Sequence, residues 1–140
     1  MQVFSNQEFI KKLQLFPQTI ELLTILSIKY SGRSNPLNNN IKQIKADFIN
    51  ICKHFITVIN VDDNKFHCPF EEKDFQHIDA IKQNLASCNI NSESNISQLI
   101  QKNINDIINF IRTTKQFDIA KEHVSKIKEN ILLVKYELFY

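Results

Sequence analysis

The side chains with the widest chemical range in this chain are its three cysteines and four histidines. They are Cys52, Cys68, Cys88, His54, His67, His77 and His123. Thiolate and imidazole together favour zinc, but zinc sites are usually built from closely spaced ligand pairs. The sequence contains no C-x-x-C and no H-x-x-x-H pair, and Cys52 and His54, two apart on a helix, would point to different faces. We therefore expect neither a metal site nor a cofactor.

A second hypothesis for these residues is a cysteine nucleophile with a histidine base. The two need not be neighbours in the sequence, because such partners are brought together by the fold. Cys68, directly after His67, is the best candidate. No basic cluster or helix N-terminus near it lowers a thiol pKa, so a small Cys/His enzyme stays an alternative. The odd number and wide spacing of the cysteines indicate reduced thiols, hence the cytoplasm or another reducing compartment.

A third kind of chemistry is carried by His123-Val124-Ser125-Lys126. This segment resembles the site of histidine phosphotransfer bundles, in which a Lys three residues after an exposed histidine helps to hold phosphate. The resemblance implies phosphate transfer to His123. The family has a small residue after that Lys, where this chain has Ile127, and the histidine falls on the final helix rather than an inner one. Phosphotransfer is therefore kept as an alternative function.

The charge balance argues against a polyanionic partner. Seventeen basic and fifteen acidic residues give a net charge of +2, whereas nucleic-acid binders usually have a strongly basic face. The N-terminal portion is net positive and includes Lys11, Lys12, Lys42, Lys45 and Lys53, but Lys42 and Lys45 alternate with apolar positions as on any solvated helix face. Weak nucleic-acid binding is the second alternative, and we do not expect it.

Membrane association is not expected either. The first eight residues have neither a basic region nor an apolar core, so no secretory signal peptide is predicted. The most apolar stretch, residues 20–28, is interrupted by Glu21 and is far shorter than the roughly 20 residues of a transmembrane helix. Ile, Asn and Lys are the commonest residues, a bias typical of an AT-rich genome.

The spacing of apolar residues predicts helices almost throughout. Ser5-Asn6-Gln7-Glu8 matches a capping box, which predicts a first helix over about residues 6–15 that ends before Pro17. A second helix, over about 18–30, is apolar nearly all round, as in a centrally buried helix. Later periodic stretches predict helices over about 41–60, 73–86, from Ser94 through Ile111, and 118–138, with loops at 31–40 and 61–72.

These elements define the predicted fold. We expect one all-α domain over residues 1–140, built as a compact bundle or orthogonal array of five to six helices. In the last helix, residues 120, 124, 127, 131, 134 and 138 form a seam with spacings of four and three, which suits packing within a bundle.

The C-terminal end of that helix carries more apolar side chains than one packed face can cover. The excess residues are Leu132, Leu133, Tyr136, Phe139 and Tyr140. Either the helix is central or it offers a second face to a partner, because exposed apolar patches tend to be interfaces. We predict a non-catalytic protein–protein interaction module, an adaptor, inhibitor or assembly subunit, that binds another protein or a second copy in a homodimer through these five residues.

Overall fold

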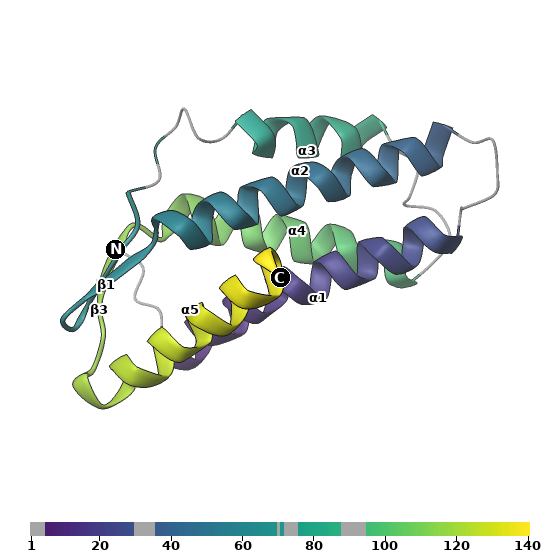
Figure 1. Ribbon diagram of the computed structural model, residues 1–140. Coiled ribbons are helices and arrows are strands. Elements are labelled where there is room, and N and C mark those ends of the chain that lie inside the picture. Colours follow the sequence, from purple (N-terminus) through teal and green to yellow (C-terminus); the bar gives the residue numbers. More distant parts are fainter. Residues whose placement is uncertain (1–4, 30–35, 70, 72–75, 88–94) are drawn as a thin grey trace.

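A computed structural model describes residues 5–29, 36–69, 71, 76–87 and 95–140. In this part of the chain, five helices pack against one another, as the sequence predicts. The helices are α1 (Asn6–Lys29), α2 (Pro36–Val58), α3 (Gln76–Ser87), α4 (Asn95–Thr113) and α5 (Val124–Phe139). Figure 1 shows an elongated bundle in which α1, α2 and α4 run along the long axis.

The first helix begins where the capping box predicts and continues further than predicted. The Glu8 amide donates to Ser5 Oγ at 3.2 Å, which satisfies one free N–H at the helix start. Pro17 does not end the helix; it lies inside α1. Apolar side chains on one face, among them Phe16 before Pro17 and Leu23 after it, are buried in the same core. Burial of this face on both sides outweighs the backbone hydrogen bond lost at Pro17.

Helix α1 is also less central than its sequence predicts. Ile25 and Ile28 are exposed, so only one face of the apolar stretch is buried. Helix α1 packs against α4, α2 and α5, while α3 packs on α2 (Figure 1). An ion pair between Arg112 Nη2 and Asp79 Oδ1, 3.6 Å apart, joins α4 to α3.

A small antiparallel sheet lies at one end of the bundle, where the sequence predicts loop and helix. Its strands, in the order β1-β2-β3, are β1 (Asn60–Asp62), β2 (Lys65–His67) and β3 (Gln116–Asp118). Asp63, in the turn between β1 and β2, has φ of 60°, a left-handed conformation that Asp tolerates better than most residues. The predicted loop over 61–72 thus contains a hairpin. The last predicted helix starts at Val124 rather than near residue 118, because residues 116–118 pair with β2 and Lys121–His123 form a 3-10 turn.

An aromatic cluster joins this sheet to the helices. The Phe66 ring of β2 lies 4.8 Å from Phe9 of α1 and 4.8 Å from Phe117 of β3, and Phe9 also contacts Phe110 of α4 at 5.6 Å. Phe55 of α2 lies 5.7 Å from Phe110. Phe9, Phe55, Phe66 and Phe110 are all buried. The cluster therefore fixes four distant parts of the chain at one place.

Phe66 is the residue on which we expect this arrangement to depend most. Truncation to alanine should lower the free energy of unfolding by about 3–5 kcal/mol, because it opens a cavity among packed rings. Urea denaturation measures the change. Phe139→Ala, which removes a half-exposed ring, is the matched control and should cost much less. An equal loss in the two variants would contradict the role of the cluster.

Candidate interaction surface

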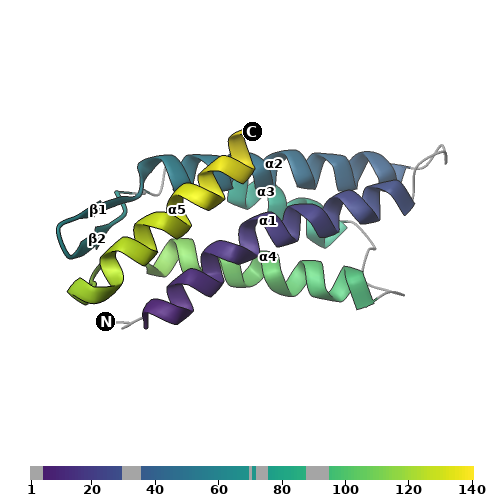
Figure 2. The same ribbon diagram turned by 60° about the horizontal axis from the view of Figure 1, so that its bottom comes forward.

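Helix α5 packs on α1 and α2 through one face. Ile127, Val134 and Leu138 of the predicted seam are buried, and Val124 and Ile131 are partly buried against the core. Spacings of seven and four place these side chains on one side of the helix. Figure 2 shows α5 crossing the bundle diagonally, with its C-terminal end reaching α2.

The five C-terminal residues singled out in the sequence lie on the other side of α5. Leu132, Leu133, Tyr136, Phe139 and Tyr140 are between 44% and 92% exposed. At 100° per residue their directions fall within about one third of the helix circumference, opposite the buried face. We call these five residues the C-terminal stripe. The alternative that α5 is a central helix is wrong, because a central helix would bury this side as well.

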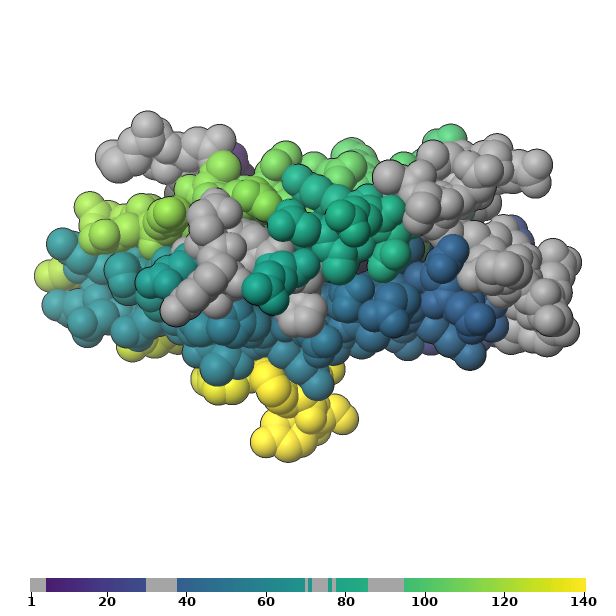
Figure 3. Space-filling model, turned by 90° about the horizontal axis from the view of Figure 1, so that it is seen from above, coloured from purple at the N-terminus to yellow at the C-terminus, as the bar shows by residue number. Residues whose placement is uncertain are grey.

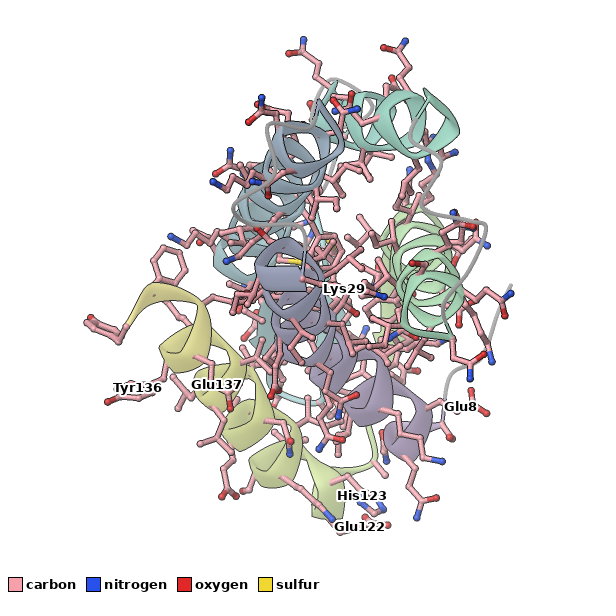
Figure 4. All side chains as sticks on the ribbon, turned by 90° about the vertical axis from the view of Figure 1, so that its right-hand side faces the viewer. Glu8, Lys29, Glu122, His123, Tyr136 and Glu137 are labelled. Carbon is pink, nitrogen blue, oxygen red and sulfur yellow. The ribbon has the colours of Figure 1, made fainter. Side chains whose placement is uncertain are left out.

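The aromatic members of the stripe have contacts of their own. The Tyr136 and Tyr140 rings stack with centroids 5.3 Å apart, and Lys53 Nζ of α2 lies 5.1 Å from the centroid of the Phe139 ring. The Lys53 contact places Phe139 on the side of α5 that is next to α2. Tyr136 points away from the rest of the molecule (Figure 4), and the end of α5 projects beyond α2 (Figure 3).

The apolar character of this outer face is confined to the end of α5. One and two turns earlier the same side carries Ser125, Lys128 and Glu129, all exposed. Other exposed apolar side chains, Ile25, Ile28 and Leu99, belong to α1 and α4. The C-terminal stripe therefore groups more large exposed apolar residues on one helix than any other described element does.

The two cysteines of the described residues are buried, which does not suit a nucleophile that substrate must reach. Cys52 and Cys68 are buried, whereas His67, on β2, is exposed, so the predicted Cys–His neighbours point to opposite sides of the sheet strand. Burial raises the pKa of the Cys52 thiol well above its ordinary value, which keeps it protonated and unreactive at neutral pH. Within the described residues, no three His, Cys, Asp or Glu side chains gather as a metal ion requires. Cys88 lies outside the described residues.

His123 lies before α5 rather than on it. It is the last residue of a 3-10 turn, Lys121–His123, and its amide donates to the Ala120 carbonyl at 2.9 Å. Its side chain is exposed, and Lys126 follows in the first turn of α5. Figure 4 shows His123 and Glu122 at the end of α5 opposite Tyr136. Phosphotransfer at His123 would thus be separate from the C-terminal stripe.

Comparisons with known proteins find no matching family model, no matching curated protein and no matching solved structure. Among the described residues, no helix combines the length and the apolar character that crossing a membrane requires.

Removal of stripe side chains should leave the fold intact. We expect Leu132→Ala and Leu133→Ala to change the free energy of unfolding by about 0.5 kcal/mol or less, because exposed side chains contribute little to folding. Ile127→Ala, one to two turns earlier on the buried face, should cost about 2–5 kcal/mol. Chemical denaturation of the three variants makes the comparison. A loss at Leu132 as large as that at Ile127 would show that the stripe is part of the core.

Proposed function

We propose that this chain is a non-catalytic interaction module that binds another protein through the C-terminal stripe of α5. It would act as an adaptor, an inhibitor or an assembly subunit. The observation that carries the proposal is the exposure of two leucines, two tyrosines and a phenylalanine side by side on a helix whose opposite face is already buried.

Energetic considerations support this use of the surface. Exposed apolar surface lowers solubility. Its burial against a partner contributes a favourable free energy of roughly 25 cal/mol for each Å² removed from water. Tyrosine and other large aromatic side chains supply much of the affinity of known interfaces, since they bury a large area with few rotatable bonds. The stacking of Tyr136 on Tyr140 restrains both rings before binding, which reduces the entropy lost on association.

The other functions considered from the sequence have less support. A Cys/His enzyme would need a thiol that substrate can reach, and the thiols of Cys52 and Cys68 are buried. A phosphotransfer module would use His123 and leave the apolar stripe without a role. A homodimer remains one form that the interaction could take, with a second copy of the chain as the bound protein.

Photo-crosslinking tests the proposal directly. The full chain carrying benzoylphenylalanine in place of Tyr136 is irradiated in extract of its source cells. We expect a discrete crosslinked product that disappears when Leu132→Asp is added. The matched control carries the same probe in place of Leu99, an exposed apolar residue of α4, and should give no such product.

The mass of the product identifies the bound protein, and a mass of twice the chain would identify a second copy. Absence of any product at Tyr136, or the same product at Leu99, would contradict the proposal.

A further inference from the structure

We infer that the partner segment is an acidic amphipathic helix, which lays its apolar face on the C-terminal stripe and its carboxylates along the lysines between α5 and α2. The inference rests on the proposed function and adds to it the chemistry of the partner. It is carried by the unequal charges along the two edges of the stripe.

The edge next to α2 is basic. The Lys53 contact with Phe139 shows which side of α5 is next to α2. Lys135 lies four residues before Phe139 and Lys128 eleven residues before it, so helical periodicity places both on that same side. Both are exposed, and Lys53 is partly exposed. Three lysines and no acidic residue therefore line this edge within the described helices α5 and α2.

Helix α2 extends the basic edge. Lys42 precedes Lys53 by eleven residues and lies on the same side of α2, and Lys45 precedes it by eight residues, about 80° around the helix. Asp47 is the only acidic residue in the α2 sequence. It is buried and accepts a hydrogen bond from Gln43 Nε2 at 3.1 Å, so its carboxylate is not on this surface.

The opposite edge of the stripe differs in charge. Glu137 and Lys126 lie there, and both are exposed. Acidic residues of a partner would be attracted at the α2 edge, whereas the opposite edge, with one glutamate and one lysine, offers no net positive charge. Such complementarity fixes the orientation of a bound helix as well as its affinity.

The shape of the surface favours a helix as the bound element. The stripe runs from Leu132 to Tyr140, the residue that caps α5, which is about 12 Å at 1.5 Å per residue. Side chains at spacings of three and four form a ridge that packs into the groove of a second helix. About two to three turns of a partner helix, with apolar residues at i, i+3 and i+4, would cover the stripe.

A second copy of the chain fits these charges less well. In a two-fold antiparallel pair of α5 helices, each edge meets the same edge of the other copy. Lys128 and Lys135 would then face the lysines of the second molecule, and like charges oppose such pairing. An anionic membrane is also disfavoured, since Glu129 and Glu137 flank the apolar residues that would enter it.

Two labelled peptides test the inference. Both are 18-residue leucine-faced amphipathic helices, identical except that one has Glu and the other Lys beside the apolar face. Fluorescence anisotropy measures their binding to the full chain. We expect the Glu peptide to bind about tenfold more tightly, a preference that weakens as salt screens the charges.

Charge reversal supplies the control. Lys53→Glu combined with Lys135→Glu should reverse the preference, so that the Lys peptide binds more tightly. Lys82→Glu combined with Lys102→Glu, which changes the same number of exposed lysines on α3 and α4, should leave it unchanged. Leu132→Asp should abolish binding of both peptides.

Equal binding of the two peptides, or a preference that Lys53→Glu with Lys135→Glu leaves intact, would overturn the inference. So would binding to phosphatidylserine vesicles with no binding to either peptide. If Tyr136 still gives its specific crosslinked product in those cases, the proposed function stands and only the acidic nature of the partner is wrong.

Discussion

The placement of α5 depends on one contact, the stacking of Phe117 on Phe66. Phe117 belongs to β3, the strand that leads into α5, and Phe66 belongs to the hairpin that follows α2. Both rings also touch Phe9 of α1, at 5.3 and 4.8 Å. Backbone pairing reinforces the contact, with the Cys68 amide donating to the Lys115 carbonyl and the Ile119 amide to the Asn64 carbonyl. The chain therefore enters α5 from a fixed point, and the diagonal path of α5 over α1 and α2 follows (Figure 2).

The C-terminal stripe is a consequence of that path. A helix that starts at the sheet and crosses the bundle at an angle can bury one face only, here that of Ile127, Val134 and Leu138. Its last turns reach beyond α2, so the residues opposite Leu138 have no element of the described structure to cover them (Figure 3). The same geometry brings Lys53 to Phe139 and sets the basic edge beside the apolar residues.

Most of the helical structure could be predicted from local pattern, because caps and periodicity act over a few residues. Ser5 caps α1, and the regularly spaced isoleucines from Ile100 to Ile111 form the buried face of α4. The continuity of α1 through Pro17 could not be predicted in this way, because it depends on burial by neighbouring helices. The sheet could not be predicted from the sequence either, because each strand has three residues and β2 pairs with a segment some fifty positions away. The five stripe residues were visible as an excess of apolar positions, whereas the role of Lys53 required knowing that α2 lies beside α5.

Hydroxyl-radical footprinting of the full chain tests whether a partner covers the C-terminal stripe of α5. In purified protein at low concentration, Leu132, Tyr136 and Tyr140 should be oxidised readily while Phe9 and Phe66 are protected. In concentrated extract of the source cells, oxidation of these three residues should fall severalfold, with that of Leu99 unchanged. Stripe residues that stay as reactive in extract as in purified protein would contradict the account, as would protection of the stripe in the purified chain.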